Sequence, residues 1–139
     1  MSEENFLFKE LSFGIIGICI EIQKEYGNFH NERVYQKVLE EKLTKEEIKF
    51  LAKPRIKVYS KDSGNIVGYY EPDVIVEEKI ILELKAKPII LKNHEVQLSE
   101  YIKTTEYEIG YVVNFGIKPL YFKRIIYTND KKNLKTNKH

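Results

Sequence analysis

The sequence predicts an α/β fold in which a mixed sheet, with an antiparallel three-strand meander and one helical crossover, is flanked by helices. The first observation is the order of the patterns, which is helix, helix, three strand segments, helix and two strands. The second is the length of 139 residues with 42% apolar side chains, which suits the core of one domain. We therefore expect a single domain over residues 1–128 and a short tail after it.

Three helices follow from the spacing of apolar residues. Between residues 5 and 25 apolar side chains recur at steps of three and four, and Gly27 is a typical C-terminal stop. A second helix is expected from about Asn31, a plausible N-cap, to Leu43. The third helix is expected over 93–105, where the apolar residues lie on mixed faces.

The strand segments are rich in Val, Ile and Tyr and are bounded by Gly, Pro, Asn and Asp. Pro54 separates the first two and indicates a bend or a sheet edge. With Ile48–Phe50 and Ile56–Tyr59 counted as one strand bent at Pro54, the expected strands before the third helix are completed by Ile66–Val76 and Ile80–Lys85. Gly110–Phe115 and Leu120–Tyr127 follow that helix.

Positive charge is concentrated near the C-terminus. Residues 123–139 hold six Lys or Arg side chains and one Asp, although the net charge of the whole chain is only +2. The tail over 129–139 has few apolar residues, so we expect it to be disordered. It either keeps the protein soluble or contacts phosphate without sequence preference.

Several classes of protein are excluded by composition. The longest apolar run near the N-terminus, Phe13–Ile20, has eight residues, whereas a bilayer span needs about 20. The single cysteine, Cys19, excludes an internal disulfide and a Cys-rich zinc site. The acidic N-terminus argues against a signal peptide, so we expect a soluble, cytoplasmic protein in a reducing compartment.

The residues that carry chemistry lie on two strands adjacent in sequence. Side chains alternate along a strand, so Glu83 and Lys85 share one face. If apolar Val74 meets Leu82 across a hairpin, Asp73 comes to lie directly opposite Glu83. The two Cβ atoms are then about 4.5–5.5 Å apart.

Two facing carboxylates repel each other unless a cation lies close by. Lys85 is one pleat away, and a hard divalent cation would also relieve the repulsion because Mg²⁺ prefers oxygen ligands. The alternative is a solvated sheet face, on which alternating Glu and Lys are common. Because Ile75 and Ile81 share this face, we favour a half-buried site whose charges need partners or a metal.

The pattern resembles a known motif. Pro72-Asp73, followed ten positions later by Glu83-Leu-Lys85, is similar to the PD-(D/E)xK phosphodiesterase motif. Over about residues 6–127 the chain resembles more closely the GxxExxY proteins of that nuclease superfamily, although Phe29 stands where the glycine of that name is expected. The matching motifs are Glu32-Arg-Val-Tyr35 after Gly27, Tyr70-Glu-Pro-Asp73, Ile81-Leu-Glu-Leu-Lys85, His94-Glu-Val-Gln97-Leu-Ser-Glu-Tyr101 and Val113-Asn-Phe-Gly116.

The resemblance implies a restriction-endonuclease-like core and a nuclease that depends on Mg²⁺ or Mn²⁺ and acts on DNA or RNA. Asp73, Glu83 and the backbone carbonyl of Leu84 would be metal ligands. Lys85 would orient or help deprotonate the attacking water. Glu32 is either an additional metal-ligating carboxylate or an ordinary first-turn glutamate.

On the third helix, Gln97 and Tyr101 are four residues apart and share a face. They resemble the Gln-x-x-x-Tyr motif of exonuclease-like members, in which Gln97 would steady the lysine region and Tyr101 would contact substrate. Tyr101 as a core residue is the alternative, and no role follows for His94.

Two other functions stay open, together with the oligomeric state. A nuclease-fold protein used for binding or assembly, with weak or absent catalysis, is the main alternative. A plain basic RNA-binding domain is less favoured because the basic excess lies in the tail. A homodimer is also open, since small nuclease domains often pair to cover both strands.

Overall fold

The computed structural model describes residues 8–136. Its helices are α1 (Lys9–Tyr26), α2 (Glu32–Lys45) and α3 (Lys92–Thr104), with a short 3-10 turn η2 (Asn129–Lys131) near the C-terminus. Its strands are β1 (Phe50–Ala52), β2 (Ile56–Tyr59), β3 (Ile66–Tyr70), β4 (Val74–Val76), β5 (Ile80–Lys85), β6 (Ile109–Asn114) and β7 (Tyr121–Ile126).

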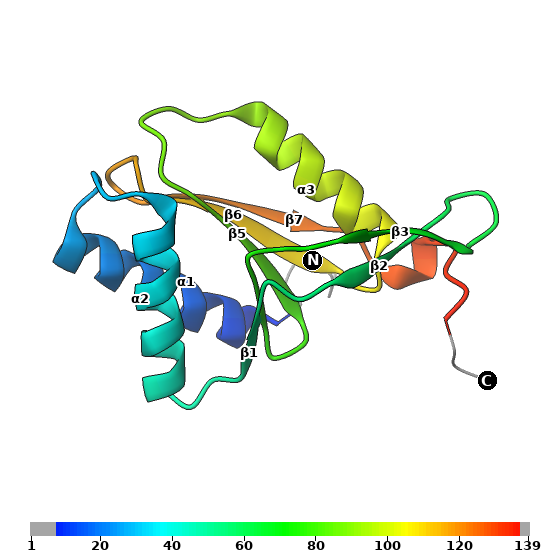
Figure 1. Cartoon of the computed structure of the whole chain (residues 1–139), viewed down its shortest axis with the longest axis horizontal. Helices are drawn as coiled ribbons and strands as arrows, with labels where there is room; N and C mark the ends of the chain where they lie inside the picture. The colour runs from blue at the N-terminus through cyan, green and yellow to red at the C-terminus, as the bar shows by residue number, and fades with distance from the viewer. Residues whose placement is uncertain (1–7, 137–139) are drawn as a thin grey trace.

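Five strands form one mixed sheet in the order β1-β4-β5-β6-β7, and β2 and β3 form a separate two-stranded hairpin (Figure 1). Only β5 and β6 are parallel within the large sheet, and α3 is the crossover between them. The other neighbours are antiparallel. The predicted mixed sheet with flanking helices and one helical crossover is therefore confirmed.

The hairpin changes how the meander is built. The expected strand over 66–76 is two strands, β3 and β4, separated by a break that contains Pro72. Proline has no N–H for a sheet ladder, so pairing stops there. The expected strand at Ile48–Phe50 starts two residues later, at Phe50. The three-strand meander consists of β1, β4 and β5, and the β2–β3 hairpin is inserted after β1.

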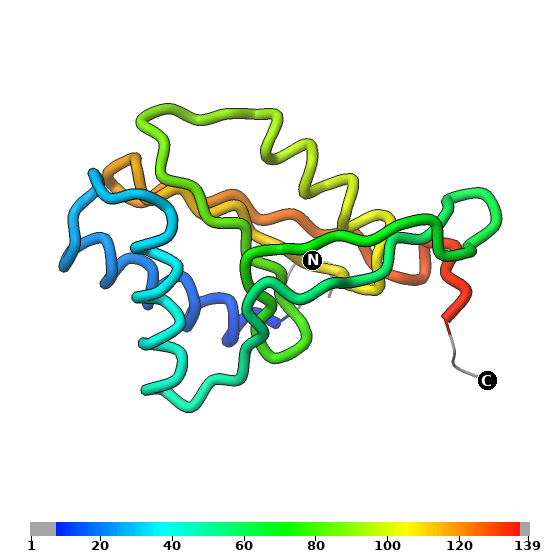
Figure 2. Tube along the Cα trace, viewed as in Figure 1, coloured from blue at the N-terminus to red at the C-terminus, as the bar shows by residue number. Residues whose placement is uncertain are grey.

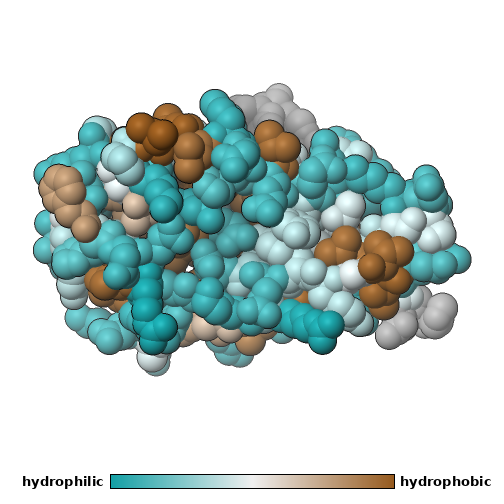
Figure 3. Space-filling view, turned by 45° about the horizontal axis from the view of Figure 1, so that its top comes forward, coloured by the Kyte–Doolittle hydropathy of each residue, from teal (hydrophilic) through white to brown (hydrophobic). Residues whose placement is uncertain are grey.

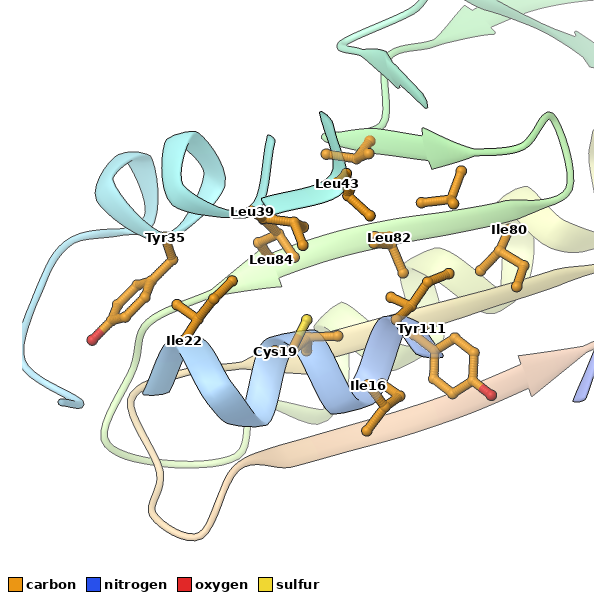
Figure 4. Close-up of a cluster of buried hydrophobic side chains, with 14 of the residues drawn as sticks. Ile16, Cys19, Ile22, Tyr35, Leu39, Leu43, Ile80, Leu82, Leu84 and Tyr111 are labelled. Carbon is orange, nitrogen blue, oxygen red and sulfur yellow. The ribbon is translucent and has the colours of Figure 1, made fainter. Parts of the chain in front are cut away.

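Helices cover both faces of the large sheet (Figure 1). On one face α1 and α2 enclose the larger apolar core, where Cys19 is fully buried. Figure 4 shows Ile16, Cys19 and Ile22 with Leu39 and Leu43 beside Leu82 and Leu84 of β5. On the other face α3 and the hairpin pack over Ile75, Ile81 and Val112. In residues 8–136 no helix is long and apolar enough to cross a bilayer.

The start of α2 agrees with the predicted N-cap. Asn31 is the N-cap, and its side chain accepts a hydrogen bond from the Val34 N–H at 3.1 Å. Tyr35 is fully buried, stacks on Phe115 with ring centroids 4.4 Å apart, and donates to the Gly27 carbonyl at 2.6 Å. Tyr35 is therefore a core residue.

The C-terminal segment differs from the expectation of a disordered tail. Residues 129–136 follow β7 back to the β2–β3 hairpin (Figure 2). The Lys132 ammonium donates to the carbonyls of Thr105, at 3.0 Å, and Tyr107, at 2.6 Å. Polar anchors thus order a segment that has almost no apolar residues, and composition alone does not reveal them. Residues 137–139 of the expected tail lie outside the described residues.

Candidate active site

The carboxylates lie where the hairpin register places them. Val74 pairs with Leu82, Ile75 with Ile81 and Val76 with Ile80, and residues 77–79 form the turn. This is the register deduced from the apolar pattern. Asp73 therefore comes opposite Glu83, and the Asp73 N–H donates to Glu83 Oε1 at 3.2 Å.

Asp73 is held by its side chain and by its backbone. Oδ2 accepts the Leu84 N–H at 2.8 Å, and Oδ1 lies 3.2 Å from the Lys53 ammonium. Its carbonyl accepts the Lys53 N–H at 2.9 Å and the Gln36 side-chain amide at 3.1 Å. Residues of α2 and β5 and the residue after β1 thus hold Asp73, with Leu84 and Lys53 on its carboxylate and Gln36 on its backbone carbonyl.

The cation that contacts the pair is Lys53, not Lys85. Sequence reasoning names Lys85 as the nearest cation because it shares the strand face with Glu83. The structure instead brings Lys53 to Asp73, from the end of β1 where Lys53 has a left-handed backbone with φ of 50°. Within residues 8–136 Lys85 forms no ion pair or hydrogen bond through its side chain.

Glu83 has a raised pKa. Burial raises its pKa to about 7, and the negative charge of Asp73 adds to the rise. The Tyr70 hydroxyl donates a short hydrogen bond to Oε2 and acts in the opposite direction. A buried carboxylate with a like charge beside it is a typical feature of functional sites.

Tyr70 links the carboxylates to α3. Its ring stacks on Tyr101 of α3 with centroids 3.7 Å apart and planes 3° from parallel. Burial raises the pKa of its hydroxyl strongly, so it remains a proton donor to Glu83. Tyr101 is half-buried in this stack and packs against the smaller apolar core. This placement agrees with the alternative in which Tyr101 is a core residue.

Gln97 lies one helical turn before Tyr101 on the same side of α3 and is exposed. Within the described chain its side-chain amide has no hydrogen-bond partner. It is therefore free to contact a ligand above the sheet, and the steadying contact with the lysine region that the resemblance implies is not formed here.

Glu32 and Lys85 both act electrostatically on His94. Burial and the positive charge of Lys85 lower the pKa of His94, and the charge of Glu32 acts against them. Glu32, at the first turn of α2, and Lys85, at the end of β5, are thus electrostatic neighbours of one imidazole. In residues 8–136 no three Asp, Glu, His or Cys side chains are grouped as a metal cluster.

A sequence model of the PD-(D/E)XK nuclease superfamily matches residues 9–125, which include the carboxylate pair and the whole sheet except the last residue of β7. The chain belongs to the PD-(D/E)XK nuclease superfamily. A search of curated proteins found no match.

Among solved structures, the chain is similar to the protein titled "Crystal structure of SSO0001", with 18% sequence identity and a TM-score of 0.49. The match covers 81% of this chain and 63% of the other, so this chain spans less than two thirds of that protein. The five-stranded mixed sheet with flanking helices is consistent with the restriction-endonuclease-like fold of the superfamily.

The PD-(D/E)XK carboxylates have the donor chemistry that a hard divalent cation needs. Two carboxylates are present, and each of their oxygens has one hydrogen-bond or ion-pair partner, which leaves further lone pairs. A metal would also offset the charge repulsion that contributes to the raised pKa of Glu83. The residues present therefore fit such an ion.

Pro72 explains why the backbone of Leu84 belongs to this site. In an antiparallel ladder a residue directs its N–H and C=O to the same edge of the strand. The Leu84 N–H faces Asp73, so its carbonyl lies on that edge too. Continuing the register puts Pro72 opposite Leu84, and proline has no N–H to donate to this carbonyl.

The larger cavities do not coincide with the carboxylates. One of about 710 Å³ adjoins Ile75 at the β1 edge, but Glu47, Glu77 and Glu78 line it, which disfavours a phosphodiester. A crevice of about 10 Å³ beside Lys85 and His94 is too small for a nucleotide. The α3 side of the molecule is mostly hydrophilic, with hydrophobic side chains in separate patches (Figure 3).

Sequence reasoning missed the roles of Lys53, Gln36 and Tyr70. Tyr70 belongs to the motif that ends at Asp73, so its position near the carboxylates could have been predicted from the sequence. Lys53 and Gln36 carry no such signal, because their contacts depend on the pairing of β1 with β4 and on the packing of α2.

Proposed function

We propose that this protein is a metal-dependent phosphodiester hydrolase that acts on DNA or RNA. The observation that supports it most is the pairing of Asp73 with a buried Glu83, whose pKa is raised to about 7, at the superfamily motif. Two carboxylates held this close destabilise the fold through charge repulsion, and binding of a metal ion would explain why the protein has them.

Asp73, Glu83 and the Leu84 carbonyl would hold Mg²⁺ or Mn²⁺. Such an ion, when bound, polarises a phosphate oxygen and lowers the pKa of water. Lys85, on the same sheet face, would donate a hydrogen bond to the attacking water or to a phosphate oxygen. Tyr70 would keep Glu83 in place through its hydroxyl.

The remaining site residues act at the edges of this arrangement. Gln97 is exposed on α3 and would contact substrate or Lys85. Tyr101 would offer its edge beside the stack with Tyr70. Glu32 would act through His94 and Lys85, or as an added carboxylate after a side-chain rotation. The finer likeness to the GxxExxY proteins, the single domain, the homodimer and the cytoplasmic location stay predictions.

One observation favours the alternative of a nuclease-fold binding module. Every oxygen of the carboxylate pair already has a partner in the protein, and one partner is the Lys53 ammonium. A site closed in this way could persist without metal or catalysis.

Calorimetry with Mn²⁺ separates the two functions. A hydrolase should bind the ion in wild type and lose that binding in Asp73→Asn and Glu83→Gln, which keep the side-chain volumes. Lys57→Gln, on the hairpin, is the matched control and should bind like wild type. Absence of a binding isotherm in wild type would favour the binding module.

A further inference from the structure

A basic pocket lies at the C-terminal end of α3, beside the β2–β3 hairpin. Its volume is about 540 Å³, and four lysines, Lys61, Lys103, Lys131 and Lys132, line it with Asp130 as the one acidic lining residue. The C-terminal segment after β7 and the hairpin lie side by side here (Figure 2).

Two of the lysines share a single carboxylate. Lys61 of the hairpin lies 2.9 Å from Glu100 Oε1, and Lys103 of α3 lies 3.7 Å from Glu100 Oε2. Their side chains remain 59% and 40% exposed, so both ammonium groups stay open to solvent. Among the residues that line the pocket, four lysines outnumber the single acid, Asp130. Further acids beyond the lining include Glu100, Glu106, which accepts from the Tyr59 hydroxyl, and Glu108, whose charge acts on Lys132.

Lys132 anchors the segment rather than facing outward. Its ammonium donates to the carbonyls of Thr105 and Tyr107, just after α3 has ended. A cation near the carbonyl end of a helix is stabilised by the helix dipole. Burial lowers the pKa of Lys132 to about 8, in keeping with an anchor that is half removed from water.

The segment is also fastened to the hairpin turn. The Asn133 side-chain amide donates to the Asp62 carbonyl at 2.7 Å, and the Lys135 N–H donates to the Gly64 carbonyl at 2.8 Å. Gly64 has φ of +76°, and a Cβ there would come within 2.6 Å of Asn133 Oδ1. The left-handed backbone at Gly64 strains any other residue, and an added Cβ would also displace the Asn133 side chain that holds the segment to the turn.

The pocket shares two structural elements with the carboxylate site. On α3, Lys103 comes two residues after Tyr101, which stacks on Tyr70. Along the hairpin, Tyr70 pairs with Ile56, whereas Tyr59, in the pocket, pairs with Ile66. The four residue steps from Ile66 to Tyr70 therefore separate the pocket from the carboxylate site by about 13 Å along the hairpin. That separation matches about four steps along one strand of a duplex, at roughly 3.4 Å per step.

We propose that this pocket binds a backbone phosphate of a nucleic acid whose scissile bond lies at Asp73 and Glu83. The proposal rests on the proposed function for the position of that bond. Lysine ammonium groups are point charges suited to phosphate, and several of them favour a polyanion over a single carboxylate. The pocket would add contacts to the nucleic-acid backbone beyond those available on the small sheet surface around Asp73.

Fluorescence anisotropy in EDTA tests the pocket without catalysis. Labelled single-stranded and duplex oligonucleotides are titrated across a salt series with wild type and with the double variant Lys103→Gln/Lys131→Gln. We expect a loss of affinity of about 5- to 30-fold at low salt and a salt slope reduced by about one to two. The control is Lys37→Gln/Lys45→Gln on α2, which removes the same charge and should bind like wild type.

Gly64→Ala provides a second test that keeps every lysine. Its added methyl group should undock the segment and reduce oligonucleotide affinity in the same direction, with the net charge unchanged. Both variants binding like the α2 control would overturn the proposal. It would also be overturned if inorganic phosphate competed with the oligonucleotide at equal affinity, since the pocket would then be a site for a small free anion.

The outcome is separable from that of the proposed function. Asp73→Asn should retain the pocket-dependent binding in EDTA while losing Mn²⁺ binding. If wild type binds oligonucleotide through the pocket but never cleaves it with Mn²⁺, the hydrolase proposal fails and the phosphate pocket stands.

Discussion

The ammonium of Lys53 lies 3.2 Å from Oδ1 of Asp73, so one oxygen of this carboxylate already has a cationic partner. The Lys53 side chain is 58% exposed, so this ion pair contributes little to stability. It is nevertheless a positive charge that a metal must displace or tolerate.

Lys53→Ala is therefore expected to strengthen Mn²⁺ binding by about two- to fivefold, because an exposed pair is worth about 0.2–1 kcal/mol. Calorimetry at low salt measures the change. Lys57→Ala, four residues along the chain, is the control. Weaker Mn²⁺ binding in Lys53→Ala would show that this lysine supports the metal site instead of competing with it.

Glu83→Gln should gain stability over wild type as pH rises in EDTA. The pKa of Glu83 is about 7 in the fold and about 4.5 when unfolded, so the unfolded chain releases its proton first. Wild-type stability then falls as pH rises between these values, whereas glutamine cannot ionise. Between about pH 5 and 8 the variant should gain roughly 1–3 kcal/mol on wild type.

Thermal melts of the two proteins in EDTA measure this difference. Asp73→Asn is the comparison: it removes the charge that adds to the raised pKa of Glu83, so its stability should depend less on pH than that of wild type. Parallel pH profiles for wild type and Glu83→Gln would mean that Glu83 is not held in a perturbed state.

Tyr70→Phe should keep the stack on Tyr101 but lose the hydrogen bond to Glu83. We expect Mn²⁺ affinity to fall, because the carboxylate loses a fixed partner, by about 10-fold or more for one hydrogen bond to a charged group. Tyr101→Phe keeps the ring and leaves Glu83 untouched, so it should bind Mn²⁺ like wild type. Equal affinities in all three proteins would remove Tyr70 from the site.

Much of this arrangement follows from sequence pattern. The alternation of Val74, Val76, Ile80 and Leu82 determines the hairpin register, and the register determines that Asp73 faces Glu83. Asn31 as a helix cap follows from local chemistry in the same way. Local periodicity is a strong constraint wherever one face must be buried.

Other features depend on long-range packing that no local pattern encodes. Lys53 reaches Asp73 only because β1 pairs with β4 across the inserted hairpin. Lys132 orders the C-terminal segment through two carbonyls that become available only where α3 ends. Composition therefore predicted disorder where a few long-range hydrogen bonds impose order.

Two glycine substitutions should change stability in opposite directions. A Cβ at Gly116 would come within 2.4 Å of the Lys87 carbonyl oxygen, so Gly116→Ala should cost roughly 3 kcal/mol. Gly17 in α1 has no atom within 4 Å of such a Cβ, so Gly17→Ala should gain about 1 kcal/mol. Urea unfolding measures both, and a destabilised Gly17→Ala would point to a partner packed on that helix face.

Cleavage of labelled oligonucleotides in Mn²⁺ tests the central claim most directly. Single-stranded, duplex and branched substrates, as DNA and RNA, are incubated with wild type, Asp73→Asn and Lys85→Met. Lys85→Met should stay folded and bind Mn²⁺, because Lys85 has no ion pair within residues 8–136. We predict that wild type cleaves at least one substrate, that EDTA stops it, and that both variants are inactive. Equal cleavage by Asp73→Asn and wild type, or no cleavage of any substrate by a wild type that binds Mn²⁺, would contradict a hydrolytic site at Asp73 and Glu83.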